Sequence, residues 1–330
     1  MSFVDPIAIE NLSALGPVFA NPAITLVLHA GDNDLIELKR RYRFTFGRVF
    51  DTSIAARFLG VRALGLDALL GQWLGVELPP SRQKDDWSAR PLKPAQEDYA
   101  ASDVEHLFTL KARLIDELDT MGRRAWVEEE CAALAALEIP DRPVDPEAFL
   151  RVKGARDLPP RALGVLREVY ETRETLARAA DRPPFKILGE DTLLKLAQAL
   201  PATPAELAEI PGCTPRVVGR WGSALLDAIA RGRALGDDAL PVLRRSPRPP
   251  GNPAAARRAE VLKKWRVEAA DRHALDPGVL LPNRLISAIA DAGPVTLDAL
   301  AAVDGVRRWR AENFGAEIVA VVSSVERRVR

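Results

Sequence analysis

The first part of the chain mixes short apolar runs with helical patterns. Residues 24–28 form an apolar run with β-branched side chains, which predicts a buried strand. A helix is predicted at 32–41, with Asp32 as its N-cap, and extended pieces at 44–46 and 48–50. Further helices are predicted at 52–59, 66–74, 94–119 and 124–137. Because strand and helix signals alternate, this part favours an α/β domain.

From residue 145 to the end, the pattern is helical, with no convincing alternation of apolar and polar residues. This half repeats itself. When the sequence is shifted by 93 residues, Pro184 aligns with Pro277 and Gly212 with Gly305, and apolar positions align between them. Such a register predicts two copies of one small helical domain. We therefore expect three domains, at 1–138, 145–238 and 254–330, separated by proline-rich linkers.

Composition excludes several classes of protein. Apolar residues make up 47% of the 330 positions, which excludes a mostly disordered chain. No apolar run approaches the length of a membrane helix, and the N-terminus has no signal-peptide pattern. The two cysteines are isolated, so neither a disulfide framework nor a zinc site is predicted. We expect a cytoplasmic protein, and nothing indicates a membrane or protein partner.

The formal net charge of zero hides an asymmetry along the chain. Residues 1–140 contain 21 acidic and 15 basic side chains, a net charge of −6. Residues 241–330 contain 10 acidic and 16 basic side chains, a net charge of +6. A basic C-terminal end favours a polyanionic partner such as nucleic acid.

Two clusters carry candidate chemistry. The predicted strand runs into His29 and then Asp34, and a carboxylate at that place can either hold a divalent cation or cap the helix. Tyr99 and Asp103 lie four residues apart on a predicted helix, so they share one face. There they can position a water beside a metal ion, or Tyr99 can be half buried beside a solvated Asp103.

The helical copies carry candidate phosphate contacts. In the first copy, a glycine turn at Gly212 opens a helix that carries Arg216 and Arg220 in its first turns. A glycine turn opening a helix presents N–H groups to an anion, although solvated arginines beside a tight turn are an equal alternative. The second copy is more basic, and we expect it to hold an RNA backbone more strongly. Its candidate residues are Arg257, Arg258, Lys263, Lys264, Arg307 and Arg308.

Taken in order, these motifs resemble the ribonuclease D family, 3′–5′ exoribonucleases of the DEDDy group. The resemblance covers essentially the whole chain. The matching segments are His29-Ala30 with Asp34, Phe50-Asp51-Thr52, Asp86-Trp87 with Arg90-Pro91-Leu92, and Tyr99-Ala100-Ala101-Ser102-Asp103. The repeated helical unit is similar to the helicase-and-RNase-D C-terminal (HRDC) domain, of which the family carries two.

The resemblance implies an α/β ribonuclease H-like nuclease domain followed by two all-α helical-bundle domains. It implies two divalent cations, Mg²⁺ or Mn²⁺, that hydrolyse RNA from its 3′ end and release 5′-mononucleotides. Asp34 and Asp103 correspond to metal-binding carboxylates, and Tyr99 to the tyrosine that orients the attacking water. The implied substrates are transfer RNA precursors with single-stranded 3′ ends. In the polar loop, Trp87 and Arg90 are candidate substrate contacts, with a structural anchor as the alternative for Trp87.

The sequence departs from the family in one respect. The other two carboxylates of the group lie in an Asp-x-Glu on the first strand, and no such motif precedes Asp34 here. We therefore expect an N-terminally incomplete nuclease domain and an inactive chain, because two carboxylates cannot neutralise two divalent cations. The alternative is a non-catalytic protein that binds nucleic acid through its helical domains. A helicase fragment is disfavoured because the chain has no phosphate-binding loop.

Overall fold

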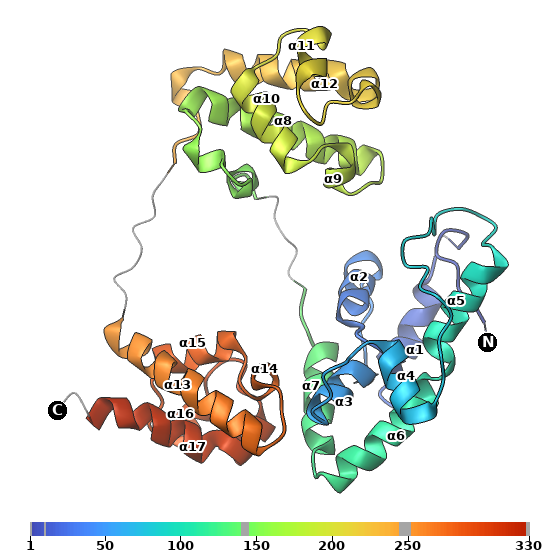
Figure 1. Ribbon diagram of the computed structural model, residues 1–330, viewed down its shortest axis with the longest axis vertical. Coiled ribbons are helices and arrows are strands. Elements are labelled where there is room, and N and C mark those ends of the chain that lie inside the picture. The colour runs from blue at the N-terminus through green and yellow to red at the C-terminus, as the bar shows by residue number, and fades with distance from the viewer. Residues whose placement is uncertain (1, 10, 140–144, 244–251, 328–330) are drawn as a thin grey trace. The chain divides into compact units, whose positions relative to one another are not determined.

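The computed structural model describes residues 2–9, 11–139, 145–243 and 252–327 (Figure 1). The chain forms two compact units. Unit 1 combines Met1–Pro140 with Pro249–Arg330, and unit 2 is Asp141–Arg248. The predicted linkers fall mostly on residues 140–144 and 244–251, which lie outside the described residues.

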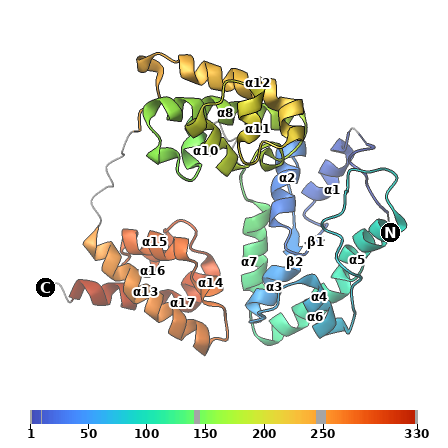
Figure 2. The same ribbon diagram turned by 45° about the horizontal axis from the view of Figure 1, so that its top comes forward.

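Two short parallel strands form the sheet of the nuclease part. β1 (Leu26–Leu28) pairs with β2 (Val49–Asp51), and Leu28 lies opposite Asp51 (Figure 2). β1 is two residues shorter than the strand predicted at 24–28, because the Ile24 N–H donates to the carbonyl of Asn21 in a turn. The extended piece predicted at 44–46 is not a strand. Its two phenylalanines pack instead into a small core with Phe19.

Helices surround these strands as the apolar spacing predicts. The helices of this part are α1 (Gly16–Ala20), α2 (Asp32–Tyr42), α3 (Thr52–Phe58), α4 (Leu66–Leu74), α5 (Pro94–Glu105), α6 (Leu107–Thr120) and α7 (Arg124–Ala135). The single helix predicted at 94–119 is wrong, because the backbone leaves helical geometry at His106 (φ −97°, ψ 0°). The break lets α6 bury a stripe that begins at Leu107 and Leu110. The N-cap of α2 is Gly31, not Asp32, which is the first helical residue.

The predicted internal repeat is confirmed helix by helix. Among the described residues of unit 2, the five α-helices are α8 (Pro160–Ala179), α9 (Pro184–Ile187), α10 (Glu190–Ala199), α11 (Pro204–Glu209) and α12 (Pro215–Ala234). Their counterparts are α13 (Pro253–Arg272), α14 (Pro277–Leu280), α15 (Asn283–Ala292), α16 (Leu297–Ala301) and α17 (Arg308–Arg327). Each begins 93 residues after its counterpart, as 160 and 253 illustrate for α8 and α13.

Backbone geometry repeats with the helices. Gly212 and Gly305 occupy equivalent turns with φ of +101° and +81°, a region that favours glycine. A Cβ at Gly212 would also lie 2.0 Å from the Thr192 hydroxyl oxygen, so the turn excludes any side chain there. The turns at Gly212 and Gly305, which lead into α12 and α17, therefore have the same backbone geometry. We call them the first and the second hairpin.

Each unit has its own hydrophobic core. The core of unit 1 runs continuously from the nuclease helices into the C-terminal helical domain, through Phe58, Trp126, Trp309 and Phe314. Unit 2 buries apolar side chains of α8, α10 and α12. Within the described ranges, no helix combines the length and apolar character needed to cross a bilayer.

Candidate functional site

Asp51 organises the turn that follows β1. Its side chain is 1% exposed and accepts hydrogen bonds from the backbone N–H groups of Ala30 (3.1 Å) and Gly31 (2.9 Å). It also caps α3, accepting from the N–H groups of Ser53 (2.8 Å) and Ile54 (3.2 Å). One buried carboxylate therefore fixes the start of α3 and the turn that leads into α2.

His29 and Thr52 complete this support. The His29 Nδ1 lies 2.9 Å from the Thr52 hydroxyl, which in turn donates to the carbonyl of Leu28. Asp34 then projects from the first turn of α2 and is exposed. The start of α2, which carries Asp34, is thus fixed by β1, by the buried Asp51 carboxylate and by the His29–Thr52 pair.

Replacing Asp51 with alanine is expected to lower the free energy of unfolding by about 3 kcal/mol. The variant loses a helix N-cap and leaves the buried N–H of Gly31 without an acceptor. Urea unfolding of the full chain measures the change. The matched control is Asp116→Ala on the exposed face of α6, where we expect less than about 0.5 kcal/mol. A loss below about 1 kcal/mol for Asp51→Ala would contradict this role.

The second half of the site lies on α5. Tyr99 is 8% exposed, and its side chain acts on the carboxylate of Asp103 one turn later. Burial raises the pKa of Asp103, whereas the Tyr99 side chain and the nearby His29 lower it. The pKa of His29 is lowered by its burial, against the charges of Asp51 and Asp103. His29, Tyr99 and Asp103 therefore share one electrostatic environment.

The polar loop before α5 folds back onto this helix. The Trp87 ring centroid lies 6.2 Å from that of Tyr99, and the Trp87 Nε1 donates to the carbonyl of Arg82. Arg90 forms a two-pronged ion pair with Asp5, at 2.6 and 2.8 Å. Its remaining nitrogen donates to the carbonyls of Trp87 and Ala89. Trp87 thus covers the Tyr99 side of the site, and Arg90 is engaged within the protein.

The donor set does not fit a two-metal centre. Among the described residues, no group of three or more His, Cys, Asp or Glu side chains is arranged to hold a metal ion. The sequence predicts two carboxylate ligands, Asp34 and Asp103, and two carboxylates can hold one Mg²⁺ only if water or substrate oxygens complete its octahedron. Two divalent cations carry four positive charges, and two carboxylates leave half of that charge uncompensated.

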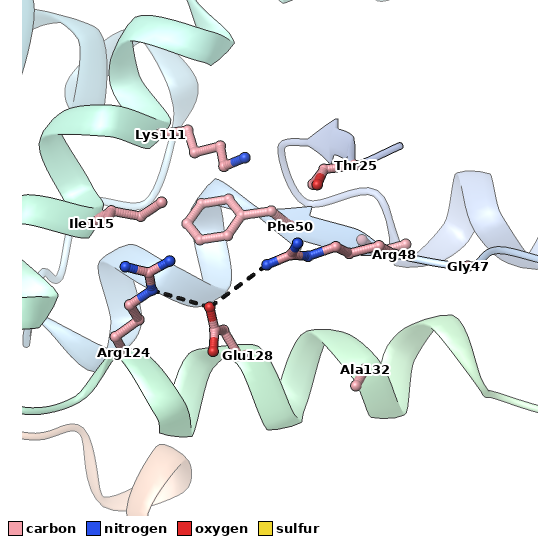
Figure 3. A pocket seen from close by; sticks show the side chains of 10 residues that line it. Thr25, Gly47, Arg48, Phe50, Lys111, Ile115, Arg124, Glu128 and Ala132 are labelled. Carbon is pink, nitrogen blue, oxygen red and sulfur yellow. Dashed lines mark hydrogen bonds and ion pairs between the residues drawn. The ribbon is translucent and has the colours of Figure 1, made fainter. Parts of the chain in front are cut away.

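A well-formed cavity lies elsewhere, and its charge is of the wrong sign for a metal. It measures about 250 Å³ and lies beside the starts of β1 and β2 (Figure 3). Arg48 and Arg124 both approach the Glu128 carboxylate, at 3.9 and 3.0 Å. Lys111 also lines the cavity, and burial together with the two arginine charges lowers its pKa. An excess of positive charge repels a divalent cation, so this cavity is not a metal centre.

The candidate RNA contacts of unit 2 are accessible. Arg216 and Arg220 are exposed on the first turns of α12. The Arg220 guanidinium lies 5.2 Å from the centre of the Trp221 ring, which orients it by a cation–π contact. Thr214 caps the helix with its hydroxyl.

The corresponding residues of the second copy are used more within the protein. Arg257 and Lys264 are exposed on α13, whereas Lys263 pairs with Glu260 and Arg258 donates to the carbonyl of Ala290. Directly before α17, the Arg307 guanidinium lies 3.5 Å from the Glu130 carboxylate of the nuclease part. The Arg308 side chain is 81% exposed and pairs with Glu312. The hairpin arginines of the two copies are thus not equivalent.

Known proteins share this arrangement. The chain matches the family models of the 3′–5′ exonuclease over residues 1–119 and of the HRDC domain over 162–229 and 255–322. Ribonuclease D of Pseudomonas paraeruginosa is 32% identical over 97% of this chain and 84% of its own length. Ribonuclease D of Granulibacter bethesdensis is 31% identical over 97% of this chain and 80% of its own length.

Solved structures agree with these relatives. The crystal structure of Escherichia coli RNase D, titled as an exoribonuclease involved in structured RNA processing, matches with a TM-score of 0.66 and 25% identity. It covers 97% of this chain and 84% of that protein. A protein from Bifidobacterium adolescentis has a TM-score of 0.75 at 21% identity, which shows the fold alone.

An exonuclease domain followed by two HRDC domains defines the chain as a hydrolase of nucleic acids that works from the 3′ end. This confirms the predicted fold class of an α/β nuclease domain followed by two helical domains. With relatives above 30% identity along nearly its whole length, the chain belongs to the ribonuclease D family of exoribonucleases.

The sequence analysis did not assign the roles of two features, Asp51 and the three consecutive glutamates of α7. The role of Asp51 had a local signal, since an Asp-Thr-Ser sequence at a strand end is typical of a helix N-cap. The acidic run Glu128–Glu129–Glu130 had none, because such a run usually lies on a solvated helix face. Only the three-dimensional structure shows what these carboxylates contact.

Proposed function

We propose that this chain acts on RNA with single-stranded 3′ ends, transfer RNA precursors above all, as a cytoplasmic 3′–5′ exoribonuclease of the ribonuclease D type. The observation that carries the proposal is the Tyr99–Asp103 pair on α5, covered by Trp87 beside the turn that presents Asp34. Membership of the ribonuclease D family supports it. The reaction would be hydrolysis of the terminal phosphodiester, with release of 5′-mononucleotides.

Each proposed site residue has a distinct task. The Tyr99 hydroxyl, one helical turn from Asp103, orients a water at the 3′-terminal phosphodiester. Asp34 and Asp103 are the proposed ligands of Mg²⁺ or Mn²⁺, which would supply Lewis acidity when bound. Trp87 presents an aromatic face on which a terminal base can stack. Because the carboxylates number two, we propose that this 330-residue chain hydrolyses RNA poorly.

The second candidate function is nucleic-acid binding without hydrolysis. Arg216 and Arg220 favour it, because both are exposed on α12 and neither depends on the metal site. Arg257 and Lys264 on α13 add positive charge in the second copy. Both functions predict RNA binding, and they differ in whether the bound RNA is trimmed.

The double variant Arg216→Ala/Arg220→Ala is expected to weaken binding of a transfer RNA precursor about tenfold at low salt. It should also reduce the dependence of log Kd on log salt by about two, one for each lost phosphate contact. Filter binding between 50 and 200 mM salt, concentrations chosen to span the screening range, measures both.

The matched control replaces Arg178 and Arg233, which are exposed on α8 and at the far end of α12. The control removes the same charge and should lower affinity by less than about threefold. Equal losses in the two double variants would show that only net charge matters, and the assignment of the α12 hairpin would then be wrong.

A further inference from the structure

A carboxylate of the nuclease part closes the N-terminus of α17. Glu129, on α7, accepts a hydrogen bond from the Arg308 N–H at 2.7 Å with one oxygen. Its other oxygen accepts from the Trp309 N–H at 2.9 Å. These are the first amides of a 20-residue helix, which have no acceptor within the helix itself. An anion that spans two such amides is bound as helix N-termini bind phosphate.

The neighbouring Glu130 extends the same contact. It accepts from the Trp309 Nε1 at 3.0 Å and lies 3.5 Å from the guanidinium groups of Arg307 and Arg310. The Arg310 side chain is 3% exposed, and it also donates to the carbonyls of Leu280 and Val279. A buried guanidinium needs such compensation, so Glu130 is required where it lies.

Apolar packing surrounds the polar contact. The Trp126 and Trp309 rings stack with centroids 4.9 Å apart, and the Phe58 ring meets Trp309 edge-on at 5.2 Å. Arg123 donates to the carbonyls of Phe58 and His273, which joins α3 to the end of α13. The surface is thus as well packed as a domain core, and the Glu129 contact lies at its edge.

Among the described residues of unit 2, the equivalent hairpin of the first copy has no carboxylate bound to its first amides. There α12 begins with Pro215, and the first amides are served by the Thr214 hydroxyl, which accepts from the Val217 N–H. Gly212 and Arg216 are exposed. The two hairpins therefore share a backbone geometry but differ in their surroundings. The first is exposed and followed by a basic residue, whereas the second has a carboxylate bound to it.

We propose that Glu129 occupies the place of a nucleic-acid phosphate on the second hairpin, so that the second HRDC domain docks the nuclease domain through its own phosphate site. The part of the proposal that concerns RNA rests on the proposed function. The second hairpin is then closed to the RNA backbone, and the first hairpin carries that contact. The ligand that the second hairpin would bind, if Glu129 did not occupy it, is a phosphodiester.

The test compares Glu129→Ala with Glu128→Ala in the full chain. Glu128 is the matched control, because it lies one residue earlier and faces Arg48 and Arg124. Hydrogen exchange of the Arg308 and Trp309 amides should quicken about tenfold in Glu129→Ala and stay unchanged in the control. Glu129→Gln keeps the side-chain shape with one acceptor and should give an intermediate rate, which separates loss of the carboxylate from loss of folding.

The RNA arm uses the same variants at low salt. Glu129→Ala should bind a transfer RNA precursor about threefold more tightly, because the freed hairpin becomes a new phosphate contact. Adding Arg308→Ala should remove that gain. Unchanged amide exchange would overturn the docking role of Glu129. Faster exchange without tighter RNA binding would overturn the phosphate site. Failure of the unaltered chain to bind RNA would instead refute the proposed function and leave the exchange result standing.

Discussion

Supplied with Mn²⁺ and an RNA with a single-stranded 3′ end, the 330-residue chain is expected to trim it at least about a thousandfold more slowly than ribonuclease D of Pseudomonas paraeruginosa assayed beside it. The physical reason is the donor set, in which Asp34 and Asp103 are the only proposed carboxylate ligands. Lewis-acid stabilisation of the developing charge contributes several kcal/mol, and losing about 4 kcal/mol of it slows a reaction by about three orders of magnitude. Release of 5′-mononucleotides over time measures the rate.

The control for this experiment is Asp103→Asn, which keeps the hydrogen bonding of the side chain and removes its charge. A rate within about tenfold of the relative's, abolished by Asp103→Asn, would show that two carboxylates suffice and that our proposal of low activity is wrong. Manganese titration of the unaltered chain supplements the assay. Weak binding that Asp34→Asn and Asp103→Asn both remove would support a residual metal site, and no binding would favour the non-catalytic function.

Replacing Trp309 with alanine is expected to lower the free energy of unfolding of unit 1 by about 3–5 kcal/mol, as loss of a large buried aromatic does. Trp309 is 2% exposed and contacts Phe58, Trp126 and Phe314. Because these rings belong to one continuous core, the nuclease part and the second HRDC domain should lose stability together. Hydrogen exchange in urea, followed separately in α6 and α15, measures the two parts.

Trp221→Ala is the control for this prediction. Trp221 packs against the core of unit 2, so its loss should leave the exchange of α6 and α15 unchanged. If Trp309→Ala destabilised α15 and left α6 unchanged, the two parts of unit 1 would be energetically independent. The continuous core would then contribute no coupling between them.

The helical half could be predicted closely because its signals are local. Pro160 and Pro253 mark helix starts, Gly212 and Gly305 mark turns, and the apolar spacing recurs at a fixed offset. The break at His106 could not be predicted, because both α5 and α6 have helical patterns and their directions depend on tertiary packing, in which Leu110 and Leu114 of α6 enter the core of unit 1. The short strands were placed within two residues, with their ends set by turns.

The candidate site was predicted in part. The pairing of Tyr99 with Asp103 follows from helical spacing, since both lie on α5 one turn apart. The ion pair of Arg90 with Asp5 joins residues 85 positions apart, and no local pattern predicts such a partner. The same holds for Glu129, whose ligands are backbone amides 179 and 180 residues away and so carry no side-chain signature.

The opposite charges of the two chain ends also acquire a second explanation. Part of the acidic excess before residue 140 and part of the basic excess after 240 meet within unit 1. Glu130 lies against Arg307 and Arg310, and Glu129 against the N-terminus of α17. The asymmetry therefore reflects complementarity between two domains as well as attraction for a polyanion.

Unit 1 is built from two stretches of chain with all of unit 2 between them. During translation the nuclease part leaves the ribosome first, and its partner helices are made last. Until then, Trp126 and three consecutive glutamates of α7 lack their partners, while unit 2 has already been synthesised. A premature stop between the two HRDC domains would therefore leave the apolar face around Trp126 available for aggregation.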